Sequence, residues 1–134
     1  MTLLASEIRL LKAARQFIEN GDTIESYGSR WEPHEISLNT AIDNCQKYFE
    51  GDDAAFRIAN DRVSRRICAA NNRNMFWSLK FLREIGYSYW REVPLETGGG
   101  KIVPGNVSEE TFKNWKILAN LAYIDRILET GEIK

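Results

Sequence analysis

The sequence predicts a mainly α-helical fold: a compact bundle of four to five helices, with a short β-hairpin or loop excursion near residues 87–105. Apolar residues recur with the 3.6-residue period of a helix in four segments. The composition, 43% hydrophobic and 28% charged over 134 residues, is typical of a globular chain that builds its own core. Glycines also follow the periodic segments, and glycine is common just after the C-terminal end of a helix. We therefore expect one helical domain over residues 1–134.

The first two helices are expected at residues 3–20 and 33–50. In the first, residues such as Leu4, Ile8 and Leu11 share one face, and a glycine follows the segment. The intervening residues 22–32 are polar and contain a glycine, so we expect a loop there. Pro33 suits the first turn of the second helix, because its missing N–H group is not needed there.

Residues 54–85 keep one apolar face throughout, but they contain the polar run Asn71-Asn72-Arg73-Asn74. Asparagine is a poor helix former and a good helix cap, so either one long helix or two helices hinged at this run is consistent with the pattern. Aromatic residues and alternation then predict the excursion at 87–105, and we find no other β-like signal. Ser108 is expected to cap a last helix that continues to about Gly131, with Trp115 on its buried face.

The net charge and the cysteine content limit the classes of protein to which this chain can belong. Eighteen basic and nineteen acidic residues give a formal net charge of −1, which argues against a surface built wholly for nucleic acid or anionic membrane. We expect Cys45 and Cys68 to be buried, reduced thiols, because both fall at apolar helical positions. The chain has no apolar run of about 20 residues and no signal-peptide pattern, so we expect no membrane contact and a cytoplasmic location.

We predict no catalytic residue, no metal ligand and no cofactor. His34, the single histidine, is expected on the surface, and neither cysteine lies at the short spacing that zinc sites use. The run Gly98-Gly99-Gly100-Lys101 invites comparison with a phosphate-binding loop. The comparison fails because Ile102 replaces the Ser or Thr that holds magnesium, and no strand–loop–helix pattern surrounds the run.

Four cations form the clearest candidate surface. At about 100° per residue on a continuous helix, they fall within roughly 40° of one another beside the apolar face. We call them the basic stripe: Arg62, Arg66, Arg73 and Lys80. Such a line of cations can contact phosphates or a partner's carboxylates, although a solvated charged flank has the same pattern. A break near residues 71–74 would split the stripe into two pairs.

Two further patterns bear on binding. Residues 58–67, with their Val63-Ser64 pair, resemble the run around the turn of the helix-turn-helix in small repressors, which implies a DNA-recognition helix. The glycine expected at the turn is replaced by Asp61-Arg62. Tyr89 and Trp90 follow the end of a helical pattern, and adjacent side chains on a strand face opposite sides. At least one of these two aromatic residues is therefore a candidate interface anchor.

Together these patterns favour a small, non-enzymatic regulatory or adaptor protein of the kind found in bacteria and their phages. Its partner is expected to be a macromolecule, most readily another protein that contacts the basic stripe, Tyr89 and Trp90. The alternatives are a nucleic-acid-binding regulator that uses the basic stripe, and an enzyme whose site cannot be read from the sequence. Homo-oligomerisation is left open.

Overall fold

The computed structural model describes residues 2–71, 77–88, 90–94 and 100–134, and it is mainly helical, as predicted. The longer helices are α1 (Ala5–Glu19), α3 (Asp53–Ala70), α4 (Trp77–Glu84) and α6 (Trp115–Thr130). The short ones are η1 (Pro33–Glu35), α2 (Leu38–Asp43), η2 (Gln46–Tyr48) and α5 (Glu109–Lys113). Two antiparallel hairpins pair β1 (Ile24–Ser26) with β2 (Ser29–Trp31), and β3 (Trp90–Pro94) with β4 (Gly100–Pro104).

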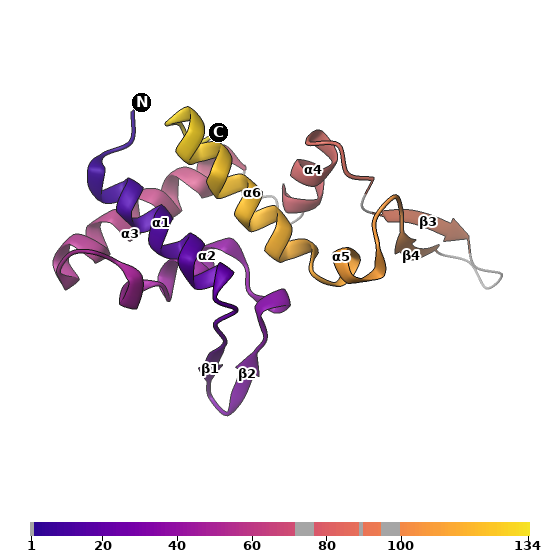
Figure 1. Cartoon of the computed structure of the whole chain (residues 1–134), viewed down its shortest axis with the longest axis horizontal. Helices are drawn as coiled ribbons and strands as arrows, with labels where there is room; N and C mark the ends of the chain where they lie inside the picture. Colours follow the sequence, from indigo (N-terminus) through magenta and orange to yellow (C-terminus); the bar gives the residue numbers. More distant parts are fainter. Residues whose placement is uncertain (1, 72–76, 89, 95–99) are drawn as a thin grey trace.

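The main core forms around α1, which contacts α2, α3 and α6 (Figure 1). Its buried positions recur with a helical period, and Leu10, Leu11 and Ala14 are fully shielded from solvent. The predicted face is partly wrong, because Leu4 precedes the helix and is 48% exposed, and Ile8 is only partly buried. Helix α6 contributes Ile124 and Ile127 to this core. It also packs against α4 through a smaller apolar cluster, so α6 connects the two parts of the helical body.

Side chains fix the starts of several helices. Ser37, Asp52 and Ser108 each accept a hydrogen bond from a backbone N–H in the first turn of α2, α3 and α5. The predicted cap at Ser108 is thereby confirmed. Gly131 ends α6 with a φ of 75°, a conformation that favours glycine.

Residues 33–50 do not form the single helix that we expected. They divide into η1, α2 and η2, because Ser37 caps a new helix inside the apolar stripe and Cys45 leaves the helical conformation after α2. His34 is partly buried in η1 rather than on the open surface. The last predicted helix also divides, at Asn114, into α5 and α6, and Trp115 is only half-buried at the start of α6.

The alternatives for residues 54–85 are decided in favour of two helices, α3 and α4. Residues 72–76 between them lie outside the described residues. Helix α3 runs without a turn across residues 58–67, so the helix-turn-helix expectation is wrong. The hairpin expected near 87–105 is confirmed as β3 and β4, while Gly98 and Gly99 lie outside the described residues.

The expectation of a loop at residues 22–32 is wrong, because β1 and β2 form a second hairpin there. Each strand has only three residues, and most of their side chains are exposed. No apolar alternation marks such short strands in the sequence. In Figure 1 this hairpin projects from the helical body, away from α1 and α2.

Candidate functional site

The structure divides the basic stripe. Arg62 is exposed on the outer side of α3. One turn further along, Arg66 faces α1, and its Nη1 lies 3.0 Å from Oε2 of Glu7. The Glu7 side chain is only 3% exposed, and that of Arg66 is 25% exposed. The guanidinium of Arg66 is therefore engaged inside the protein, whereas that of Arg62 faces solvent.

The remaining predicted contact residues lie elsewhere. Lys80 is exposed on α4, beyond the break in the stripe. Arg73 and Tyr89 lie outside the described residues, and Trp90 begins β3 opposite Pro104. The structure thus brings Arg62 and Arg66 together on α3 and places Lys80 on a separate helix. A partner-binding role for these six residues stays a prediction.

A different surface is better defined: the hairpin of β1 and β2. Its register pairs Ile24 with Trp31 and Ser26 with Ser29. The two connecting residues, Tyr27 and Gly28, have φ values of 51° and 78°. Positive φ at both positions is the signature of a type I′ turn, whose twist matches that of the paired strands. The turn therefore closes the hairpin tightly and places Tyr27 at its tip.

Tyr27 combines backbone strain with complete exposure. It is the one non-glycine residue with positive φ in the part of the chain that the structure describes. The left-handed conformation costs an L-residue with a side chain roughly 1–2 kcal/mol. Tyr27 as a whole residue is fully exposed, so no packing within the protein offsets this cost. The turn requires this conformation but does not require tyrosine, so a costly aromatic residue at this position is a reason to infer a function.

Trp31 adds a second aromatic side chain to the same hairpin. It is 47% exposed although tryptophan is among the residues that gain most from burial. We refer to Tyr27 and Trp31 as the hairpin surface. Between them, Arg30 on β2 pairs with Glu32 at 3.2 Å, so its charge is partly neutralised.

The start of the hairpin is held by a hydrogen-bonded clamp. The carboxylate of Asp22, two residues before β1, accepts the Tyr48 hydroxyl at 2.6 Å and lies 3.0 Å from Nζ of Lys47. Nδ2 of Asn20 donates to the same Tyr48 oxygen at 2.8 Å. Burial acts to raise the pKa of Asp22, but the bonds from Tyr48 and Lys47 outweigh it and leave the pKa below its usual value. This clamp joins the hairpin to η2.

The end of the hairpin is anchored as well. The N–H of Glu32 donates to Oε1 of Glu35 at 3.1 Å, across the first turn of η1. Next, Nδ2 of the buried Asn120 in α6 donates to the carbonyl oxygen of Ile36 at 3.2 Å. Both chain ends of the hairpin are therefore fixed to the helical body. A surface fixed in this way loses little conformational entropy on binding a partner.

Sequence reasoning missed this surface for identifiable reasons. The strongest hairpin signal is Asn-Gly or Asp-Gly between two alternating apolar runs. Here Tyr27-Gly28 occupies the turn, and the flanking residues are mostly polar. The available signal was Gly28 itself, which lies centrally between Ile24 and Trp31, where a two-residue turn requires a positive φ.

Comparison of the chain with models of known protein families, with curated proteins and with solved structures finds no match. Within the described residues, no three His, Cys, Asp or Glu side chains are grouped so that they could hold a metal ion. None of the helices described is both long enough and apolar enough to span a bilayer.

Proposed function

We propose that this chain is a small regulatory or adaptor protein that binds a protein partner through the hairpin surface, Tyr27 and Trp31. The observation that carries the proposal is Tyr27, a strained and fully exposed aromatic residue on an anchored hairpin. Tyrosine and tryptophan are enriched among the residues that dominate the binding energy of protein interfaces. Their rigid rings offer a large contact area at low cost in conformational entropy.

Charge favours a protein over a nucleic acid as the partner. The hairpin carries Glu25 on β1, and Glu32, which follows β2, partly neutralises Arg30. A phosphate backbone is attracted by unpaired cations and repelled by such carboxylates. On α3, the pairing of Arg66 with Glu7 reduces the cations that a nucleic acid could contact. We also propose a cytoplasmic location, because Cys45 and Cys68 are both free thiols.

The test compares captured partners between variants that keep the hairpin intact. Tyr27→Asn removes the ring but suits the left-handed turn, whereas Tyr27→Phe keeps the ring. Extract of the native host is passed over each immobilised protein after nuclease treatment, and bound proteins are identified by mass spectrometry. We expect a partner that the wild type and Tyr27→Phe retain and that Tyr27→Asn and Trp31→Ser lose.

Each captured partner is then purified, and its affinity is measured directly. A loss of about tenfold or more for Tyr27→Asn, in a variant with an unchanged circular dichroism spectrum, supports the hairpin surface. Equal affinity of wild type, Tyr27→Asn and Trp31→Ser would refute it. Binding that disappears with nuclease would favour a nucleic-acid partner instead.

A further inference from the structure

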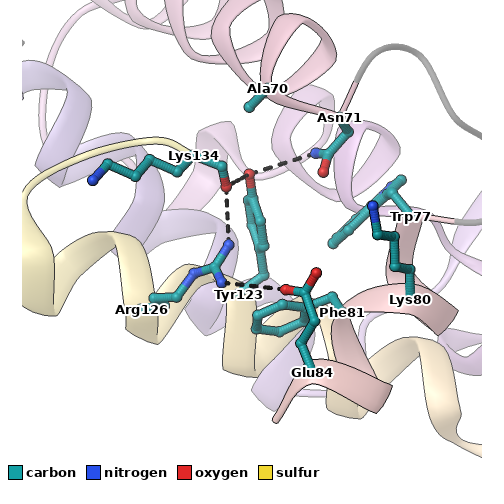
Figure 2. Close-up of a pocket in the computed structure, with 9 residues that line it drawn as sticks. All are labelled: Ala70, Asn71, Trp77, Lys80, Phe81, Glu84, Tyr123, Arg126 and Lys134. Carbon is teal, nitrogen blue, oxygen red and sulfur yellow. Dashed lines mark hydrogen bonds and ion pairs between the residues drawn. The ribbon is translucent and has the colours of Figure 1, made fainter.

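A pocket of about 320 Å³ opens between the C-terminal end of α3, helix α4 and helix α6 (Figure 2). The side chains that define it are Trp77, Lys80, Phe81, Glu84, Tyr123 and Arg126. We propose that it binds a small aromatic anion: a flat ring system that carries a carboxylate, sulfonate or phosphate group. This site is separate from the hairpin surface, and the proposal does not depend on the function proposed above.

Aromatic rings from two helices form the walls of the pocket. The ring centroids of Trp77 on α4 and Tyr123 on α6 are 4.8 Å apart, and their planes are tilted by 60°. Phe81 meets Tyr123 edge to face at 5.4 Å. Trp77 remains partly exposed at the start of α4, so part of its ring is open to a ligand. Offset and edge-to-face contacts with such rings favour a flat aromatic ligand.

The same aromatic cluster disfavours a cationic ligand. Aromatic rings can bind ammonium groups through their faces. Here the guanidinium carbon of Arg126 already lies 4.6 Å from the Phe81 centroid and 5.2 Å from the Tyr123 centroid. The protein's own cation therefore takes the position that a ligand cation would need over these two rings, and it would repel a cation that approached the pocket.

Arg126 is held in place by the C-terminal residues of the chain. Its Nη2 donates to the main-chain oxygen of Lys134 at 2.9 Å, and the Tyr123 hydroxyl donates to the same oxygen at 2.8 Å. Burial raises the pKa of Tyr123, so its hydroxyl stays protonated and continues to donate at neutral pH. The guanidinium thus stays oriented beside the rings before any ligand arrives, as binding without reorganisation requires.

The charges around the pocket leave Lys80 as the cation that a ligand anion can reach. Lys80 and Arg126 lie on opposite sides of the pocket, but Arg126 is already bonded to the main-chain oxygen of Lys134 and lies near the carboxylate of Glu84 (Figure 2). Glu84 lies 4.0 Å from Nη1 of Arg126, and its side chain is 55% exposed, so this pair is weak. The Nζ of Lys134 is engaged by Glu132 at 2.9 Å. Lys80, by contrast, has no ion pair with a described residue and can meet an acidic group of the ligand.

The volume of the pocket limits the size of the ligand. A volume of about 320 Å³ lies at the low end for small-molecule sites, so we expect one ring system with its acidic group. Naphthalene-2-sulfonate is a probe of this kind. We would titrate it into the full chain and follow chemical shifts by NMR. Matched probes replace the sulfonate with a neutral hydroxymethyl group or with a trimethylammonium group.

We expect saturable binding of the sulfonate and at least about tenfold weaker binding of the neutral and cationic probes. Lys80→Glu should weaken sulfonate binding at least about tenfold, because it replaces the unpaired cation with an acid. The matched control is Arg62→Glu, an equally drastic charge reversal on the exposed side of α3, which should change the affinity less than about twofold. Lys80 is exposed, so its substitution is expected to leave the circular dichroism spectrum unchanged.

Three results would overturn the proposal. One is a lack of saturation at about 10 mM sulfonate, because a site that uses both the aromatic rings and Lys80 should fill at a lower concentration. Another is equal binding of the three probes, which would mean apolar adsorption. The third is equal loss of binding in Lys80→Glu and Arg62→Glu, which would mean attraction to net charge rather than to this pocket. The probe comparison uses the wild-type chain and stands even if a variant misfolds.

Discussion

The guanidinium of Arg66 in α3 donates to the carboxylate of Glu7 in α1 at 3.0 Å. The other carboxylate oxygen of Glu7 accepts the backbone N–H of Leu4 at 2.7 Å, which closes the first turn of α1. Because the Glu7 side chain is 3% exposed, its charge depends on these partners rather than on water. One buried carboxylate thus caps α1 and ties it to α3.

Removing the Arg66 side chain should show how far the buried charge of Glu7 destabilises the protein when it has no cationic partner. We expect Arg66→Ala to lower the free energy of unfolding by about 2 kcal/mol, because Glu7 loses a charged partner but stays shielded from water. Urea denaturation followed by circular dichroism measures the change. The matched control is Arg62→Ala, which removes an exposed guanidinium one turn away and should cost less than about 0.5 kcal/mol. Equal costs for the two variants would contradict this assignment.

A substitution in the turn between β1 and β2 is predicted to stabilise the protein rather than destabilise it. Tyr27→Asn should raise the free energy of unfolding by about 1 kcal/mol, because asparagine tolerates the left-handed conformation and the fully exposed ring loses no contact. Thermal unfolding would show the gain. Tyr27→Ala removes the ring but keeps the strain, so it should leave stability nearly unchanged. A clear loss in Tyr27→Asn would mean that the ring packs against the protein.

The helical parts of the fold could be predicted because their signals are local. The apolar period of α3 directly reflects which face is buried, and Asn71 lies where α3 ends. In α1 the period identifies the helix, but the buried face includes Glu7 and leaves Leu4 exposed. The breaks at Ser37 and Asn114 were missed for a related reason. The apolar period continues across both residues, so periodicity alone could not reveal a new helix start.

Contacts between distant segments could not be predicted in the same way. A helical projection places Arg66 beside Arg62, but Glu7 lies 59 residues earlier in the chain. Nothing local indicates that the two side chains meet. Likewise, Tyr48 and Asp22 are 26 residues apart, and only the folded chain shows that they anchor one hairpin.

The two cysteines should differ sharply in reactivity. Cys45 is fully buried, and burial raises the pKa of its thiol to about 12. At pH 8 its thiolate fraction is then on the order of 10⁻⁴, and thiolate is the reacting form. Cys68 is only partly buried, with Nδ2 of Asn39 at 3.5 Å from its sulfur. We therefore expect iodoacetamide to label Cys68 first and Cys45 only on unfolding.

Peptide mass spectrometry over a time course would separate the two sites. The variant Cys68→Ser isolates Cys45, and adding urea should then raise its labelling rate to that of an unfolded thiol. Rapid labelling of Cys45 without denaturant would show that the α2 end of the core opens readily.

The hydrogen-bonded clamp at the start of the first hairpin predicts how the stability of the protein depends on pH. In the folded chain, the pKa of Asp22 lies below its usual 3.8, since hydrogen bonds from Tyr48 and Lys47 outweigh the effect of burial. A lowered pKa means that folding favours the carboxylate, so this stabilisation is present at neutral pH and is lost as the pH falls through the folded value.

Tyr48→Phe removes one hydrogen-bond donor and should raise the pKa of Asp22. An NMR titration that follows the chemical shift of the Asp22 carboxyl carbon would measure this pKa. Tyr87→Phe, which alters a tyrosine in the cluster between α4 and α6, should leave that pKa unchanged. If Tyr48→Phe also leaves it unchanged, the Tyr48 hydroxyl does not hold Asp22, and the hairpin must be fixed through Lys47 and the contacts of η1.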